Sequence, residues 1–146
     1  MEDRYLFKAR SVYEINEWVV GYYIVFNGKD SIFEKKPEKY YSIEAAETSC
    51  GNRITEVIPE TVCQCTGRKD KNGKLIFEND ILSGHIDVEF PEDETRKRVV
   101  WHENGWCTNE PGCDDYEELD DFDSENFEVI GNIFEGEFNG KNSKKD

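Results

Sequence analysis

The chain has 146 residues, which suits one domain, or one domain with a small appendage, and allows a real hydrophobic core. Only 36% of the residues are apolar and 35% are charged, but 13% are aromatic, and each large ring buries much area. No apolar run approaches 18 residues and no basic-then-apolar leader opens the chain, so we expect neither a membrane span nor secretion. The five cysteines are then expected to be reduced thiols in a cytoplasm.

The first part of the chain is expected to form antiparallel strands, because runs rich in Trp, Val, Tyr and Ile alternate with turn residues. The predicted elements are strands over residues 5–11 and 17–26, a turn at 27–30, a return strand over 31–34, one helical turn over 43–48 and a short strand over 53–58.

The strongest local signal in the second part is a hairpin, in which strands over residues 62–67 and 75–82 flank Asp70-Lys71-Asn72-Gly73. Asn-Gly tolerates the positive φ angles that a tight hairpin turn requires. The further predictions are strands over 86–90 and 97–101 around an acidic turn, a strand from 105, either a loop over 110–126 or a short helix over 115–121, a strand over 127–134 and a polar tail over 139–146. So many short strands with Gly and Pro turns indicate a barrel or a sandwich.

The net charge of −15 is concentrated, because residues 99–140 contain 13 Asp and Glu and no Lys or Arg. Such a field repels phosphate backbones, so this face is not expected to bind duplex nucleic acid directly, whereas a basic protein partner is allowed. The acids predicted to form a partner-binding surface are Glu110, Asp114, Asp115, Glu117, Glu118, Asp120, Asp121, Asp123 and Glu125. A plain solvated surface and imitation of a nucleic-acid backbone are the alternatives for the same run.

Two segments resemble the YopX family of phage and prophage proteins: Glu60–Leu82, which contains the hairpin, and Phe127-Glu-Val-Ile-Gly-Asn-Ile-Phe-Glu135. Three shorter segments agree with the family pattern, namely Arg4–Arg10, Glu17–Ile24 and Ile58–Val62. The chain departs from that pattern at Asn79, where many members have Gly, and over residues 103–126, which match no part of it.

The resemblance implies a mainly β fold with minor α, as a small, partly open SH3-like β-barrel with an antiparallel N-terminal extension. It implies N-terminal strands over residues 1–58, a barrel over 59–138 with the acidic insertion 103–126, and a flexible tail over 139–146. The family's fold is known but its biochemical activity is not, so the resemblance gives architecture and context without a reaction.

The cysteines invite a metal hypothesis, because Cys63 and Cys65 are two residues apart on a predicted strand and point to one face. Zinc would need further ligands, for which the chain offers Cys50, Cys107, Cys113, His85 and His102. No pair has the spacing of a zinc knuckle, so we expect buried thiols, no metal and no cofactor.

The run Asp121-x-Asp123-x-Glu125 resembles the start of a calcium loop. Asn126 replaces the glycine that such a loop needs at its sixth position, and Asn132 stands at the twelfth in place of glutamate. A selective calcium site is therefore not expected there.

Several residues are assigned structural roles. Asp80 is expected to hold loop amides at a strand start, and Gly131 to mark a bulge in the last strand. The aromatic residues beside the acids are expected to anchor the loop or to serve as contact hot spots: Tyr116, Phe122 and Phe127. The candidates for a core or an interface are Trp18, Tyr22, Tyr23, Phe77, Trp101 and Trp106.

The hairpin carries a basic tip, which is either a soluble turn or a contact for the acidic face of a second copy in head-to-tail self-association. Its residues are Arg68, Lys69, Lys71 and Lys74.

We expect a non-catalytic accessory protein of the phage and prophage type, a self-associating protein-interaction module. The alternative is an acidic inhibitor or nucleic-acid mimic that binds a host nucleic-acid-handling or defence protein. An enzyme is not expected, because the chain has no P-loop, no G-x-S-x-G, no H-E-x-x-H and no dinucleotide fingerprint.

Overall fold

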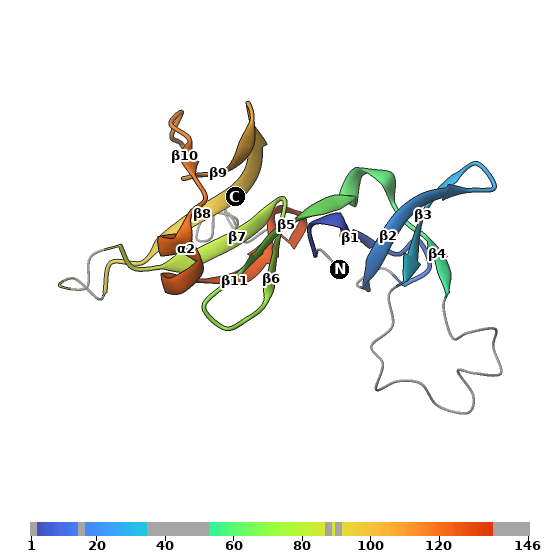
Figure 1. Ribbon diagram of the computed structural model, residues 1–146, viewed down its shortest axis with the longest axis horizontal. Coiled ribbons are helices and arrows are strands. Elements are labelled where there is room, and N and C mark those ends of the chain that lie inside the picture. The colour runs from blue at the N-terminus through green and yellow to red at the C-terminus, as the bar shows by residue number, and fades with distance from the viewer. Residues whose placement is uncertain (1–2, 15–16, 35–52, 87–88, 90–91, 136–146) are drawn as a thin grey trace, which may run out of the picture. The chain divides into compact units, whose positions relative to one another are not determined.

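The computed structural model describes residues 3–14, 17–34, 53–86, 89 and 92–135 (Figure 1). The chain divides into two compact units, Met1–Gln64 and Cys65–Asp146. The boundary falls inside a strand, whereas the sequence places it at residue 58.

The N-terminal unit is built on an antiparallel sheet with the strand order β4-β3-β2-β1. Its elements are η1 (Asp3–Tyr5), β1 (Phe7–Arg10), β2 (Trp18–Phe26), β3 (Lys29–Glu34), β4 (Ile54–Glu56) and η3 (Pro59–Thr61). Asn27 and Gly28 connect β2 to β3 with φ values of 55° and 78°, the positive angles that a two-residue hairpin turn requires.

One face of this sheet carries the core of the N-terminal unit. Ala9, Val19, Ile32 and Val57 are buried together, and Phe7 and Val62 pack against them. Gly21 lies on the same face of β2, where an added Cβ would come within 2.1 Å of the Phe33 carbonyl oxygen. A larger residue at this position would therefore push β2 away from β3.

Strand β5 (Cys63–Lys69) contributes to both units. Its first two residues pair with β1, where Cys63 lies opposite Lys8 and Gln64 opposite Phe7. From Cys65 onward the strand pairs with β6 (Leu75–Phe77) and forms the predicted hairpin.

The C-terminal unit contains a five-stranded antiparallel sheet with the order β10-β9-β8-β7-β11. Its strands are β7 (Asp80–Gly84), β8 (Thr95–His102), β9 (Gly105–Asn109), β10 (Glu117–Glu118) and β11 (Phe127–Asn132). Helix α2 (Asp121–Asn126) precedes β11, which runs beside β7 and ends in η4 (Ile133–Glu135) (Figure 1). The core of this unit consists of Ile76, Leu82, Val99, Leu119 and Phe127, with Trp106 and Val129 packed against it.

Asp70 fixes the hairpin tip onto β11. One oxygen of its buried carboxylate accepts hydrogen bonds from the backbone N–H groups of Asn72 (2.8 Å) and Lys74 (2.9 Å), which close the turn. The other oxygen accepts from the backbone N–H of Val129 in β11 (2.8 Å). The Lys71 N–H also donates to the Phe127 carbonyl (3.0 Å). The hairpin tip is therefore fixed by hydrogen bonds to β11, which lies more than 50 residues later in the chain.

The turn between β6 and β7 explains the departure from the family pattern at Asn79. Asn79 has a φ of 72°, a left-handed conformation that Asn adopts more readily than most residues other than glycine. The Asp80 carboxylate accepts a hydrogen bond from the Phe77 N–H (2.8 Å), which confirms its predicted role. Because this turn separates β6 from β7, the predicted single strand over residues 75–82 is wrong.

The mainly β, antiparallel fold class is confirmed. The described strands do not close into a barrel, in agreement with a partly open β structure. The bulge at Gly131 is confirmed, because the pairing of β11 with β7 shifts register between Val129 and Gly131.

Two element predictions for the C-terminal unit are wrong. The helix lies at Asp121–Asn126 instead of 115–121, because Asp120 and Asp123 form a capping box in which each side chain accepts the other's backbone N–H (both 3.2 Å). Of the strand predicted over 86–90, the described residues Ile86 and Glu89 lie outside any strand, and the other three are outside the described residues; β7 ends at Gly84 and pairs with β8. The helical turn over 43–48 and the tail over 139–146 lie outside the described residues. Among the described residues, no helix combines the length and the apolar content needed to cross a membrane.

Replacing Asp70 should lower the free energy of unfolding of the C-terminal unit. In Asp70→Ala three backbone N–H groups lose a charged acceptor, and we expect a loss of about 3 kcal/mol in the free energy of unfolding. Urea unfolding would be followed by tryptophan fluorescence in a Trp18→Phe background, so that Trp101 and Trp106 report on this unit. Lys71→Ala removes an exposed side chain from the same turn and should change stability by less than about 0.5 kcal/mol. Equal effects of the two substitutions would contradict the role of Asp70.

Candidate functional site

The acidic segment, residues 110–125, is anchored to the sheet of the C-terminal unit. Glu117 and Glu118 form β10 and pair with Thr108 and Cys107 of β9. The Leu119 N–H donates to the Trp106 carbonyl (3.0 Å), and the Leu119 side chain is buried in the core. The segment therefore presents its charges from a fixed backbone.

The structure places eight of the nine predicted partner-binding acids on the surface. They are Glu110, Asp114, Asp115, Glu117, Glu118, Asp120, Asp121 and Glu125. Asp123 is buried, so its assignment to an exposed surface is wrong.

Asp123 forms a buried ion pair with Lys97 of β8. The distance between Asp123 Oδ1 and Lys97 Nζ is 2.6 Å, and both side chains are almost fully buried. The Lys97 ammonium also lies 4.5 Å from the centre of the Phe127 ring, a cation–π contact. Sequence reasoning missed this pair, because nothing in the charge run distinguishes one aspartate that faces inward.

A groove of about 370 Å³ opens beside this ion pair. Glu117, Glu118 and Asp120 line it with exposed acidic residues, and Lys97 and Asp123 are its buried members. Two large apolar side chains complete the lining, Ile86 (55% exposed) and Phe122 (43% exposed). The groove therefore combines exposed carboxylates with accessible apolar surface.

The aromatic residues beside the acids contact the rest of the C-terminal unit. The Tyr116 ring stacks on His102 with a centroid distance of 3.8 Å, and the Phe122 ring meets Phe127 edge-on at 6.4 Å. Phe127 is buried, whereas Tyr116 and Phe122 remain partly exposed. These contacts agree with the anchoring role and leave two rings accessible.

The basic tip is only partly available to a second molecule. Arg68 Nη1 lies 2.9 Å from Asp121 Oδ1 and 3.5 Å from Ser124 Oγ, so it pairs with the acidic segment of its own chain. Lys69, Lys71 and Lys74 are exposed.

Two of the three carboxylates of the calcium-like run are paired with cations of the protein. Asp121 pairs with Arg68, and Asp123 pairs with Lys97. The run forms helix α2 instead of a metal-binding loop. Among the described residues, no three His, Cys, Asp or Glu side chains converge in a way that could hold a metal ion.

The thiols differ in burial. Cys63 and Cys65 are fully buried, as expected for structural thiols, and Cys50 lies outside the described residues. Cys113 is exposed and Cys107 is half-buried. Burial raises the pKa of the Cys107 thiol, and the charges of Glu118 and Glu103 raise it further, so this group resists ionisation.

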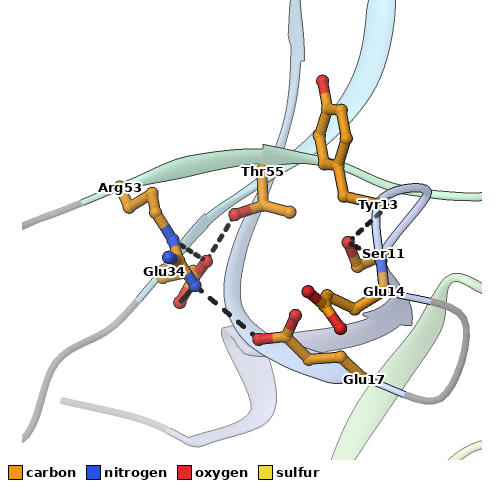
Figure 2. A network of polar contacts seen from close by, with 7 residues as sticks. All are labelled: Ser11, Tyr13, Glu14, Glu17, Glu34, Arg53 and Thr55. Atoms are coloured by element: carbon orange, nitrogen blue, oxygen red, sulfur yellow. Dashed lines mark hydrogen bonds and ion pairs between the residues drawn. The ribbon is translucent and has the colours of Figure 1, made fainter.

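A second polar cluster lies in the N-terminal unit and is shown in Figure 2. Arg53 Nε lies 2.9 Å from Glu34 Oε2, and Arg53 Nη2 lies 3.7 Å from Glu17 Oε2. Thr55 Oγ1 donates to the same Glu34 carboxylate. The hydrogen bond and charge of Glu34 raise the pKa of Arg53, which stays protonated. These contacts join β4 to β3.

The same cluster borders an open cavity of about 580 Å³. Ser11 lies on its wall, and its hydroxyl oxygen accepts the backbone N–H groups of Tyr13 (3.0 Å) and Glu14 (3.3 Å) (Figure 2). Ser11 thus stabilises a turn. Sequence reasoning missed this cluster, because only the register of the sheet brings residues so distant in sequence together.

Comparison with known proteins identifies the family. The model of the YopX protein family matches residues 16–137, which is most of the chain. The chain belongs to the YopX family. It is also similar to the crystal structure of protein EF1440 from Enterococcus faecalis, with 21% identity and a TM-score of 0.47. That match covers 89% of this chain and 93% of the other. No curated protein matches this YopX-family chain.

The buried ion pair generates a prediction. Lys97→Met leaves the Asp123 carboxylate buried without its cation and should cost about 3 kcal/mol or more in stability. Adding Asp123→Asn removes that charge and keeps an oxygen to accept the Asp120 N–H, so the double variant should be more stable than Lys97→Met alone. Chemical unfolding of the parent chain, the two single variants and the double variant, analysed as a double-mutant cycle, would measure the coupling.

The control for this cycle is Arg68→Met, which breaks the exposed pair with Asp121 and should cost less than about 1 kcal/mol. Strictly additive effects of Lys97→Met and Asp123→Asn would show that the two charges do not depend on each other.

Proposed function

We propose that this YopX-family chain is a non-catalytic accessory protein of the phage and prophage type, acting in the cytoplasm of a bacterial host. It is a self-associating interaction module, and its acidic groove binds a basic segment of a protein partner. The groove beside Lys97 and Asp123 is the observation that carries this proposal, because it joins exposed carboxylates to exposed apolar side chains.

The charges of the groove select the chemistry of the partner. Among the described residues that line the groove, Lys97 is the one cation and is already paired with Asp123. Glu117, Glu118 and Asp120 therefore have no counter-charge from this described lining. Ile86 and Phe122 add apolar contact area beside these carboxylates. A partner segment that fits has Lys or Arg interleaved with apolar side chains.

A second function is favoured by the acidic surface as a whole, of which the groove is one part. Eight exposed acids within residues 110–125 present a dense negative charge that resembles a nucleic-acid backbone. An inhibitor of a host nucleic-acid-handling or defence protein would use such a surface. Competition between this protein and DNA for a captured partner would distinguish this function from simple docking.

Neutralising the groove should weaken binding to a basic peptide. A fluorescent peptide of alternating Lys and Leu is the probe, and its affinity is measured by anisotropy at low and high salt. We expect Glu117→Gln with Glu118→Gln to weaken binding about fivefold at low salt, and the difference to shrink as salt screens the charges.

The matched control is Asp114→Asn with Asp115→Asn, which removes the same charge from exposed positions that do not line the groove. This variant should bind nearly as tightly as the parent chain. Equal loss in both variants would mean that net charge, and not the groove, attracts the peptide. Absence of binding to the parent chain at low salt would reject the groove as a peptide site.

A further inference from the structure

The sheet of the N-terminal unit has a second face that carries large apolar side chains. In an antiparallel pair, residues directly opposite each other project from the same face. Tyr22 of β2 lies opposite Phe33 of β3, and Phe33 lies opposite Ile54 of β4. Val20 lies two residues from Tyr22 on β2 and therefore shares its face. We call this the outer face, because the core residues Ala9 and Ile32 project from the other one.

The apolar side chains of the outer face are not fully covered. Val20 is 36% exposed, Phe33 37%, Ile54 39% and Phe26 48%. Trp18, Tyr22 and Ile24 project from the same face of β2 as Val20 and Phe26, and they are half-buried. A contiguous apolar surface that spans three strands is unusual for a monomer and marks an interaction surface. Aromatic residues such as these are enriched in protein interfaces.

Opposite charges stand at two diagonal corners of this surface. Lys8 lies opposite Val20 in β1, with its ammonium 5.3 Å from the centre of the Trp18 ring. Glu56 lies opposite Ser31 in β4, an edge strand, whereas β1 is also paired with β5. Between these corners the outer face carries mostly apolar side chains, centred on Tyr22 and Phe33. Two further cations, Arg10 and Lys29, lie on the same face beyond this region, opposite Trp18 and Phe26.

The two corners are equally far from that centre. With a strand spacing of about 4.8 Å and a rise of about 3.4 Å per residue, Lys8 lies roughly 7 Å across and 7 Å along from the point between Tyr22 and Phe33. Glu56 lies roughly as far in the opposite direction on both counts. A two-fold axis in the plane of the interface, along the other diagonal, therefore superposes Lys8 of one copy on Glu56 of the next. The two sheets then cross near 90°, one of the two preferred sheet packings.

We propose that the outer face is a homodimer interface, in which the N-terminal sheets of two copies pack face to face around this two-fold axis. The contact is isologous, since the same patch serves both copies and the Lys8–Glu56 pair occurs twice. This inference rests on the self-association in the proposed function. It assigns that self-association to the outer face instead of the hairpin tip.

The first test is the mass of the full-length protein by light scattering and sedimentation across a concentration series. The parent chain should have the mass of a dimer. Phe33→Lys puts a charge at the centre of the outer face and should give a monomer. Val25→Lys is the matched control, because Val25 is 62% exposed on β2 but projects from the opposite face, and it should stay dimeric. Thermal unfolding of each variant checks that the monomer is folded.

The second test reverses the corner charges. Lys8→Glu and Glu56→Lys should each weaken dimerisation about tenfold or more, because every dimer contains the pair twice and each change makes it repulsive. The double variant should restore most of the affinity.

A monomeric parent chain would overturn the proposal, as would a dimer that survives Phe33→Lys. Failure of the double variant to restore affinity would overturn the crossed arrangement. Glu117→Gln with Glu118→Gln should keep the dimer mass, so failure of the acidic groove and failure of the interface are separable.

Discussion

The organisation of the C-terminal unit depends on one buried carboxylate. Asp70 accepts hydrogen bonds from its own turn and from Val129, so that the hairpin tip and β11 are fixed together. The fixed β11 begins directly after α2, whose capping box orients Asp123 toward Lys97. The acidic segment leads into this helix, and its groove therefore has a defined shape. The mutually repelling carboxylates of the acidic segment are thus held in place by buried contacts, namely the hydrogen bonds of Asp70 and the ion pair of Asp123 with Lys97.

The acids of residues 110–125 have separate tasks, although they look equivalent in the sequence. Asp123 neutralises a buried lysine, Asp120 and Asp123 cap a helix, and Asp121 pairs with Arg68. Glu117 and Glu118 lie on an edge strand with their side chains exposed. Charged residues on an edge strand also protect a sheet from unwanted pairing with other strands. Solubility and partner selection can thus share the same two residues.

Local signals predicted most of the strands of the described chain. Asn27-Gly28, Asp80 and Gly131 each fix backbone geometry within a few residues, and each was assigned correctly. The hairpin at Asn72-Gly73 was also predicted correctly, although only Gly73 has a positive φ there (84°). The errors have one local cause and two distant ones. The helix began at Asp121 because of an aspartate pair with no apolar periodicity, and the burial of Asp123 depends on a lysine 26 residues away. The cluster around Arg53 depends on strand register, which a single sequence does not reveal.

The shared strand β5 limits how chains of this family can recombine. Cys63 and Gln64 pair with β1, while Cys65 and Lys69 pair with β6, with no loop between the two sets. Genetic recombination between two diverged genes within β5 would join half of this strand from one parent to half from the other. The hydrogen-bonded pairing of β5 with β1 and its pairing with β6 would then both have to be preserved. A crossover in the β8–β9 turn, at Glu103 and Asn104, still divides one ladder but leaves β5 intact. Inheritance of both halves as a single block is the expected result.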